Sequence, residues 1–364
     1  MVSAAKTIYH DRVIVGGGSA GCVLASRLSE DIRCSVLMLE AGDAFAPDNF
    51  PGVLANADHL GGGTEYDWGY QSEPNRFGHR IAAQSGKVLG GGSTINAAVA
   101  KRARFNDFAR WQQHGLDGWA FDDVLPTYKA LENTPSGEDA WHGRSGPLPI
   151  RQPGMADITP SLRAFVDSAI SLGFDWINDC NGQDQHGVAI DPFNVVDGIR
   201  QNTAMTYLTA AARQRPNLTI RGRTHVDRII FEGTRASRLR LVGGETLEAS
   251  DIILCAGSMA AQRSSCDPVL VRAIIFVSSA STSLLIFRSA SNYTIIPSST
   301  ALTRSSREAA HCIRPEVRPS GQTRQRRATA SWISKSRHRI RKIPRPVQLA
   351  VSLRLQQQSL HHVR

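Results

Sequence analysis

The chain has 364 residues, 41% of them hydrophobic, and a formal net charge of +10. This length allows two domains or one large α/β unit, and the hydrophobic content is enough for a packed core. The six cysteines form no CxxC pair, which excludes the common zinc-site spacings and is typical of reduced thiols in an intracellular protein.

The positive charge lies in the last part of the chain. Residues 263–364 carry 18 Lys and Arg against 3 Asp and Glu, a net of +15, whereas the first 262 residues carry −5. Of the 31 glycines, only Gly321 follows residue 262. Two compositions are therefore joined, and each needs its own interpretation.

The N-terminal stretch DRVIVGGGSAGCVLASRLSED predicts a nucleotide-binding turn. Val13–Val15 is an apolar run typical of a buried parallel strand, and a stretch with helical periodicity follows the glycines. Gly16, Gly18 and Gly21 have the GxGxxG spacing, which allows a tight turn and brings the backbone close to a pyrophosphate at the helix N-terminus. A second apolar strand ends at Glu40, whose carboxylate can accept hydrogen bonds from a ribose. The pattern indicates a dinucleotide, either FAD or NAD.

A second glycine-rich segment, SGKVLGGGSTINAAVAKRARFNDFARW, follows. Gly90, Gly91 and Gly92, with Ser93 after them, predict a flexible loop before an apolar helical stretch that begins at Ile95. Such a loop can present backbone N–H groups to a phosphate or a flavin ring. Taken alone, the segment is equally typical of a turn before a surface helix.

Both segments together resemble the motifs of the glucose–methanol–choline oxidoreductases, FAD enzymes that oxidise alcohols, and they are choline-dehydrogenase-like. RQNTAMTYLTAAARQRPNLTIRGRTHVDRIIFEG and DIILCAGS resemble later segments of the same family. The resemblance runs from about Tyr9 to about Ala260. It implies an α/β fold, with an FAD-binding Rossmann-like domain of the glucose-oxidase type, a partial α+β substrate domain and an irregular C-terminal tail.

The resemblance also divides the chain into domains. We expect residues 1–157 to form the first part of the FAD-binding domain, with the flavin loop, and residues 158–224 to form a partial substrate-binding domain. Residues 225–262 would supply the returning strands of the FAD-binding domain, and residues 263–364 would be an aberrant, disordered Arg/Ser-rich tail.

The resemblance further implies a set of residues that hold FAD. The pyrophosphate would lie at Gly16, Gly18, Ser19, Ala20 and Gly21. The adenosine ribose would lie at Glu40, and the adenine at the backbone of Val226, with Ala256 and Gly257 beside the first loop. Ala41 is a further expected cofactor-binding residue. Val88, Gly91, Asn96 and Ala97 would follow the pyrophosphate and the flavin. From residue type alone, Glu40 can also be a surface carboxylate and Asn96 a helix cap.

Two positions depart from the family pattern. Ile95 stands where some members carry the histidine that binds flavin covalently, so we expect non-covalent FAD. Ala100 stands where many relatives have an aromatic residue, which leaves the packing nearby open. Trp68, in YDWGYQSEP, is expected to pack in the core and not against the flavin.

The resemblance stops within DIILCAGSMAAQRSSCDPV, where the family continues with a Ser-Pro-x-Leu-Leu-x-x-Ser-Gly pattern. One choice of codons for Ala260–Val269, read in a shifted frame, encodes Ser-Pro-Thr-Leu-Ile-Leu-Arg-Ser-Ser. We therefore interpret the later residues as the product of a frame shift near Ser258–Gln262. The family's catalytic histidine would lie beyond this point, and the histidines found there stand in no matching context: His311, His338, His361 and His362. We assign no catalytic residue and expect a catalytically incomplete chain.

Other interpretations stay open. The main alternative is a non-catalytic dinucleotide-binding fragment with a basic tail. An NAD-linked Rossmann enzyme is another, and the second glycine loop argues against it. The stretch RQRRATASWISKSRHRIRKIPRP carries charge suited to phosphates. It lacks a folded module, however, and Trp332 is its only aromatic residue, so we expect no nucleic-acid partner.

The expected partner in the intact family is a small-molecule alcohol. The run VLVRAIIFVSSASTSLLIF contains Arg272 and a Ser/Thr-rich middle, so we expect no membrane span. The start MVSAAKTIYHDRVIV lacks the pattern of a secretory signal, which makes the cytoplasm the default compartment. The oligomeric state and the electron acceptor are left open.

Overall fold

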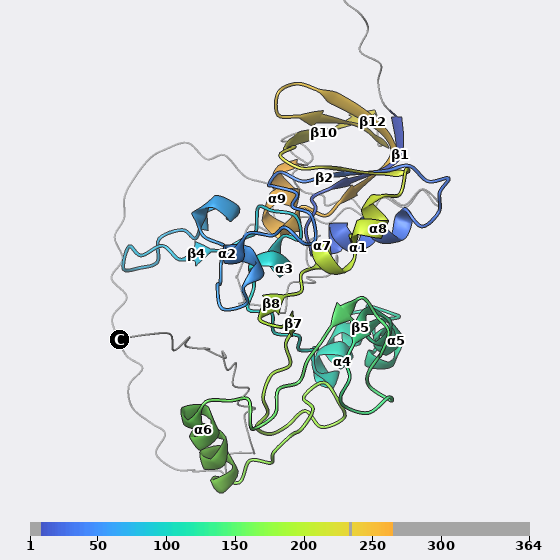
Figure 1. The fold of residues 1–364 in the computed structure, drawn as a ribbon. Helices are drawn as coiled ribbons and strands as arrows, with labels where there is room; N and C mark the ends of the chain where they lie inside the picture. Colours follow the sequence, from blue (N-terminus) through green and yellow to red (C-terminus); the bar gives the residue numbers. More distant parts are fainter. Residues whose placement is uncertain (1–8, 233–234, 265–364) are drawn as a thin grey trace, which may run out of the picture.

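The computed structural model describes residues 9–232 and 235–264. The strands of its largest sheet are β1 (Tyr9–Val15), β2 (Val36–Leu39), β9 (Leu218–Arg221), β10 (Val226–Glu232), β11 (Arg235–Leu241) and β12 (Thr246–Leu254). They are arranged in the order β10-β11-β12-β1-β2-β9. The strands from β12 to β9 are parallel, whereas β10 and β11 add an antiparallel extension (Figure 1).

The central strands are buried on both faces, as parallel strands with continuous apolar runs are expected to be. All four residues of β2 are buried, and so are Val13–Val15 in β1. β1 pairs with β12 through Val13 and Ile252, and with β2 through Val15 and Leu39. The segment DIILCAGS therefore returns to the first motif, as the sequence predicts.

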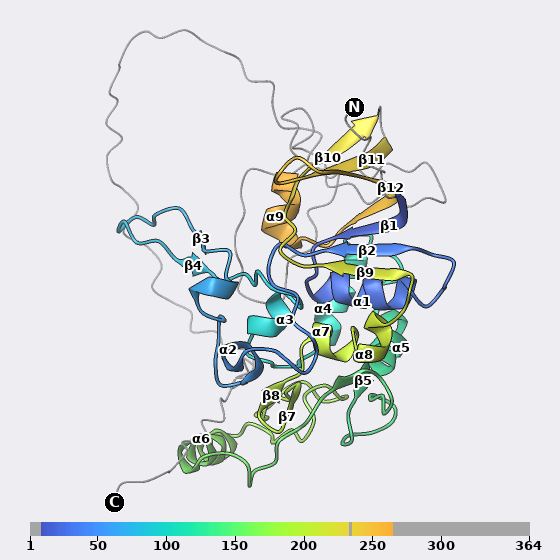
Figure 2. The ribbon, with the colours of Figure 1, turned by 45° about the horizontal axis from the view of Figure 1, so that its top comes forward.

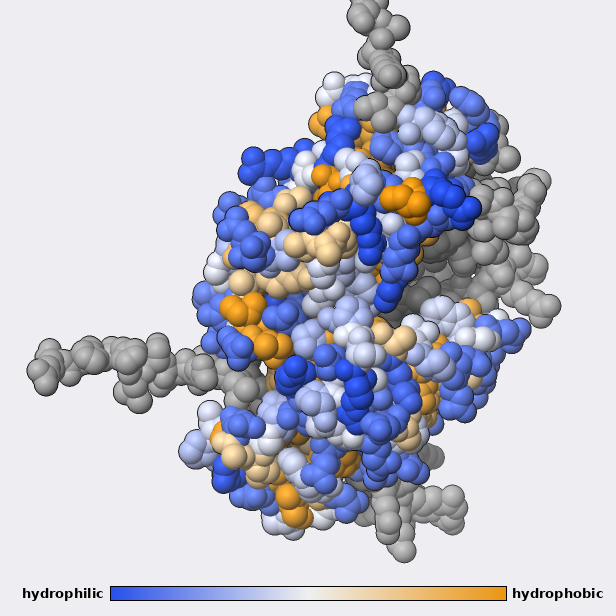
Figure 3. Space-filling model, turned by 45° about the vertical axis from the view of Figure 1, so that its right-hand side comes forward, coloured by the Kyte–Doolittle hydropathy of each residue, from blue (hydrophilic) through white to orange (hydrophobic). Residues whose placement is uncertain are grey.

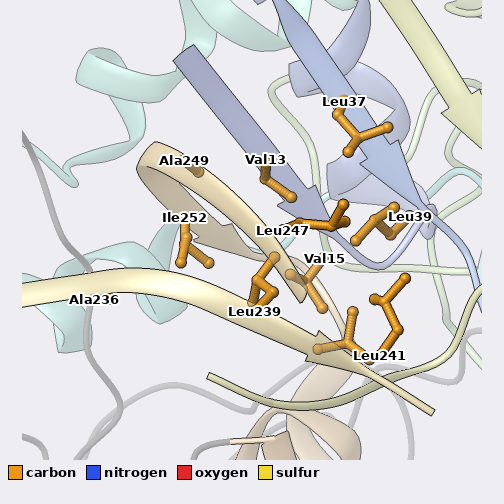
Figure 4. Packing of buried hydrophobic residues seen from close by; sticks show 11 residues of the cluster. Val13, Val15, Leu37, Leu39, Ala236, Leu239, Leu241, Leu247, Ala249 and Ile252 are labelled. Atoms are coloured by element: carbon orange, nitrogen blue, oxygen red, sulfur yellow. The ribbon is translucent and has the colours of Figure 1, made fainter. Parts of the chain in front are cut away.

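Each face of the central strands has its own core. On one face, Val13, Val15, Leu37 and Leu39 pack against the antiparallel extension, whose buried side chains include Leu239 (Figure 4). The other face packs against α1 (Ser19–Leu28), α7 (Thr203–Thr206) and Leu208, which lies just before α8 (Ala210–Arg213). Full burial of each such aliphatic side chain contributes roughly 1.5–3 kcal/mol. The two cores fix the ends of β1, β2 and β12, where the site lies.

Short elements connect this sheet to the glycine loop. They are α2 (Gly52–Ala55), the 3-10 helix η1 (Thr64–Tyr66), β3 (Tyr70–Gln71), β4 (Ala82–Ala83) and α3 (Gly92–Ile95). β3 and β4 form a hairpin that extends away from the sheet (Figures 1 and 2). Leu54, Tyr66, Val88 and Ile95 form a small buried cluster that holds α2, η1 and α3 together.

A second group of elements lies below the sheet in Figure 1. It comprises α4 (Phe105–Gln113), α5 (Phe121–Leu131), β5 (Glu132–Asn133), β6 (Leu148–Pro149), α6 (Pro160–Ser171), β7 (Val195–Val196) and β8 (Ile199–Arg200), while α9 (Gly257–Ser264) follows β12. Aromatic rings join α4 to α5, with Phe105 and Phe121 4.4 Å apart between ring centroids. α6 packs on Val188 and Ile190 through Val166 and Ala169. On the face that Figure 3 draws, apolar residues form small patches among polar ones.

A buried ionic network stabilises this second group. His142 Nδ1 lies 2.9 Å from Glu132 Oε1, and His142 Nε2 lies 2.7 Å from Asp179 Oδ2. Arg102 also donates to Glu132 Oε1, at 2.8 Å. Burial would lower the pKa of His142, but its hydrogen bonds to the two carboxylates raise the pKa to about 9. His142 is therefore held as a cation between Glu132 and Asp179.

The observed α/β architecture confirms the predicted fold class. The domain boundaries stay a prediction, and β9, which falls within the expected 158–224 segment, pairs with β2 in the large sheet. No helix within residues 9–232 and 235–264 is long and apolar enough to cross a membrane. The run VLVRAIIFVSSASTSLLIF and nearly all of the predicted tail lie outside the described residues. The compartment and the absence of a nucleic-acid partner stay predictions.

Candidate functional site

A cleft of about 470 Å³ lies at the carboxyl ends of the central strands. Ligands of open parallel α/β sheets bind at this edge. The lining comes from seven segments of the chain, and comprises Val15, Gly16, Gly18, Ser19, Ala20, Leu39, Glu40, Ala41, Trp68, Gln84, Ser85, Gly86, Gly91, Gly92, Thr224, His225, Val226, Cys255, Ala256, Gly257, Ser258, Met259 and Ala260. Most of the cofactor residues predicted from the sequence are therefore brought to one place.

Glycine is required where the turns of the cleft touch. Gly16 has φ +98°, and a Cβ there would lie 2.6 Å from the carbonyl oxygen of Cys255. A Cβ on Gly91, with φ +53°, would lie 2.7 Å from the Cα of Gly18. The two glycine-rich turns are also hydrogen-bonded, since the N–H of Gly90 donates to the carbonyl of Gly17 at 2.7 Å. Residues of both turns line the cleft.

The cleft leaves room where an extended anion would lie. A Cβ built on Gly92 or Gly257 meets no atom within 4 Å. α1 begins at Ser19, and the N–H of Cys22 bonds to the carbonyl of Gly18 at 3.0 Å. The N–H groups at the start of a helix have no partner within the helix, so they are available to a phosphate.

Glu40 lies buried at the end of β2, with 6% of its surface exposed. Its Oε2 accepts from the N–H of Gly17 and its Oε1 from the N–H of Gly42, both at 2.8 Å. Burial raises the pKa of Glu40, against the opposing effect of these hydrogen bonds. A carboxylate has about four lone-pair positions, so Glu40 keeps acceptor capacity for ribose hydroxyls. The surface-carboxylate interpretation is wrong.

Trp68 lines the cleft and is only half buried, so its expected place in the core is wrong. Its ring stacks on Tyr70 with centroids 6.0 Å apart and meets the edge of His225 at 5.4 Å. Lys87 Nζ lies 5.2 Å from the ring centroid. The position of Trp68 depends on the β3–β4 hairpin, a long-range feature that the local pattern YDWGYQSEP does not reveal.

A second cavity, of about 640 Å³, lies beyond the glycine loop. Its lining includes Ala97, Arg151 and Phe193, and it has three carboxylates, Asp58, Asp157 and Asp197. Gly91 lines the first cleft and Ala97 lines the second cavity. The loop between them therefore connects the two spaces.

Four predicted cofactor residues do not line the first cleft. Gly21 lies under it, where a Cβ would be 2.1 Å from the carbonyl oxygen of Gly16. Val88 is fully buried, and its carbonyl accepts from the N–H of Gly91 at 2.8 Å. Asn96 directly follows α3, and its Oδ1 accepts from the N–H of Ala98 at 3.0 Å, a bond within the loop. The fourth, Ala97, lines the second cavity.

The parallel sheet, the glycine turn before α1 and the carboxylate after β2 define a dinucleotide-binding Rossmann-like domain. A family model described as GMC oxidoreductase matches residues 10–263. The chain belongs to the GMC oxidoreductase family. The match ends close to Ala260, where the sequence predicts that the resemblance stops.

Individual relatives support this assignment. An oxygen-dependent choline dehydrogenase of Rhizobium etli (strain CIAT 652) is 38% identical over 242 residues, which are 65% of this chain and 43% of the relative. A second one, of Brucella ovis, is 37% identical over 260 residues, 68% of this chain and 46% of the relative. The chain therefore spans less than half the length of these curated relatives.

Solved structures show the same fold. The crystal structure of pyridoxine 4-oxidase from Mesorbium loti has a TM-score of 0.65 and 36% sequence identity, and the match covers 70% of this chain and 50% of that one. A formate oxidase structure has a TM-score of 0.62 at 23% identity, covering 72% and 48%.

Proposed function

We propose that this chain binds FAD non-covalently in the first cleft, and that its family reaction is oxidation of the CH–OH group of a small alcohol. One observation carries the proposal. The glycine loop lines the dinucleotide cleft at Gly91 and the second cavity at Ala97. A dinucleotide lying along this loop would have its adenosine in the first cleft and its redox-active end toward the second cavity.

In this proposal, described residues hold the pyrophosphate, the ribose and the adenine of FAD. The N–H groups of Ser19 and Ala20 would hold the pyrophosphate. Glu40 would accept from the adenosine ribose, and the backbone of Val226 would meet the adenine. Bound FAD would supply the hydride acceptor of the reaction, while the second cavity, lined in part by Phe193, would take the alcohol.

The surroundings of Ile95 support non-covalent binding. Its side chain is buried in the cluster with Leu54, Tyr66 and Val88 and offers no nucleophile for a bond to flavin. Precipitating the FAD-loaded protein with acid should release all the flavin into the supernatant. Yellow colour that stays with the washed precipitate would contradict this proposal.

None of the described residues that line the second cavity is a histidine, and its acidic groups are the carboxylates of Asp58, Asp157 and Asp197. General-base catalysis requires a base within hydrogen-bond reach of the substrate hydroxyl. We therefore propose that the described part supplies the cofactor site and one wall of the substrate cavity. In this proposal a histidine base would come from residues outside the described part.

Anaerobic reduction tests this proposal. The FAD-loaded full chain should lose its visible flavin absorbance with dithionite and keep it with choline or pyridoxine. Bleaching by either alcohol at a rate proportional to protein concentration would show that the chain already contains a complete catalytic site.

A further inference from the structure

Arg200 joins three segments of the chain through its guanidinium group. It lies at the end of β8 and is fully buried, with 0% of its surface exposed. Its Nε donates to the carbonyl of Asn96 at 3.0 Å, and its Nη1 donates to the carbonyl of Thr94 at 2.8 Å. It also donates to the carbonyls of Leu54 and His59. Arginine is seldom fully buried, so this placement points to a specific task.

Two of the four acceptors belong to the glycine loop. Thr94 and Asn96 flank Ile95, and the next residue, Ala97, lines the second cavity. The other two acceptors lie at α2 and just after it. The planar guanidinium has five N–H donors in a fixed arrangement, so it fixes the distance and the angle between the loop and α2.

A second contact holds the loop at Ser93, the residue directly before Thr94. The N–H of Thr203 donates to Ser93 Oγ at 3.2 Å, and Thr203 Oγ1 lies 3.1 Å from Ser93 Oγ. Ser93 Oγ in turn donates to the carbonyl of Gly90 at 2.7 Å. Arg200 and Thr203, three residues apart, thus hold neighbouring residues of a loop that lies more than 100 residues earlier in the sequence.

We propose that Arg200 is the positioning residue for the flavin-facing end of the glycine loop. It fixes the carbonyls of Thr94 and Asn96, so that the peptide of Ala97 faces the second cavity. This inference rests on the proposed function, because it assumes that FAD is the ligand. Arg200 touches no reacting atom and acts through the loop.

Comparing FAD with ADP isolates this role. ADP needs only the adenosine and pyrophosphate contacts at Ser19, Glu40 and Val226, whereas FAD also depends on the end of the loop. Arg200→Lys keeps the charge, but its single ammonium group cannot span four carbonyls. We expect the affinity of the purified full chain for FAD to fall about tenfold, the equivalent of one lost charge-assisted hydrogen bond, and the affinity for ADP to stay unchanged.

Two further variants complete the test. Arg144→Lys is the matched control, because Arg144 also donates to backbone carbonyls, those of Ser136 and Gly137 at 2.7 Å, but lies outside both cavities. It should leave both affinities unchanged. Thr203→Val removes the hydroxyl contact to Ser93 and should weaken FAD binding about threefold.

The visible circular dichroism of bound FAD gives an independent readout, since it reports the surroundings of the ring. It should change in Arg200→Lys and stay unchanged in Arg144→Lys. Equal losses of FAD and ADP affinity in Arg200→Lys would show a general folding role and overturn the inference, as would unchanged affinity for both. Failure of the unmutated chain to bind FAD would instead overturn the proposed function.

Discussion

His142→Gln removes the charge at the centre of the buried ionic network. In the folded protein His142 lies between Glu132 and Asp179, and only 4% of its surface is exposed. Glutamine is uncharged and can donate from its amide to only one carboxylate in this geometry. Breaking a buried pair in this way leaves an incompletely compensated charge, which is strongly destabilising.

The raised pKa of His142 determines how much its charge contributes to the free energy of unfolding, and over which pH range. A rise in pKa from 6.5 to about 9 means that folding strengthens the binding of this proton by about 3 kcal/mol. Because the folded pKa lies above the unfolded one, the stabilisation is complete below pH 6.5 and is lost as the pH rises to about 9. Against a total stability of about 5–15 kcal/mol, such a loss is readily measured.

Urea unfolding of the full chain at several pH values between 6 and 9.5 provides the assay. The free energy of unfolding of the unmutated chain should fall by about 3 kcal/mol more than that of His142→Gln over this range. The matched control is His79→Gln, at an exposed position in the β3–β4 hairpin, which should follow the unmutated chain. Parallel curves for the unmutated chain and His142→Gln would refute the buried cation.

Three further predictions concern the first cleft. Gly91→Ala places a Cβ 2.7 Å from the Cα of Gly18 and should weaken FAD binding at least about tenfold in a fluorescence titration. Gly115→Ala is the control: Gly115 has φ +81° and no atom within 4 Å of a Cβ, and this variant should bind FAD normally. Glu40→Gln sets an amide N–H against a backbone N–H donor and should weaken the binding of FAD and of ADP equally, by about tenfold in calorimetry. A loss of affinity for FAD alone would contradict the placement of the ribose at Glu40. ADP should quench the fluorescence of Trp68, and Trp68→Phe should abolish that quenching; an unchanged signal would exclude Trp68 from the adenosine end.

The first motif could be predicted because its determinants are local. Val13–Val15 supplies a buried strand, and the GxGxxG spacing supplies a turn that only glycine can form, as the 2.6 Å approach of a Cβ on Gly16 to Cys255 shows. Glu40 follows the next strand at the expected distance. In each case the residue type and its spacing already contain the physical constraint.

The remaining parts depend on contacts between distant segments. Trp68 reaches the cleft through a hairpin whose strands are two residues each, too short to produce a periodic pattern. Arg200 looks like an ordinary surface arginine in sequence, and its burial depends on carbonyl groups more than 100 residues away. β9 has only four residues and follows the two short helices α7 and α8, so the sequence does not predict its pairing with β2.

FAD binding by the purified full chain is the most direct test of the proposed function. FAD titrated into the apoprotein should bind with a stoichiometry of one per chain, ADP should compete with it, and NAD should not. A folded chain that binds no FAD, or that binds NAD in its place, would contradict the assignment of the first cleft.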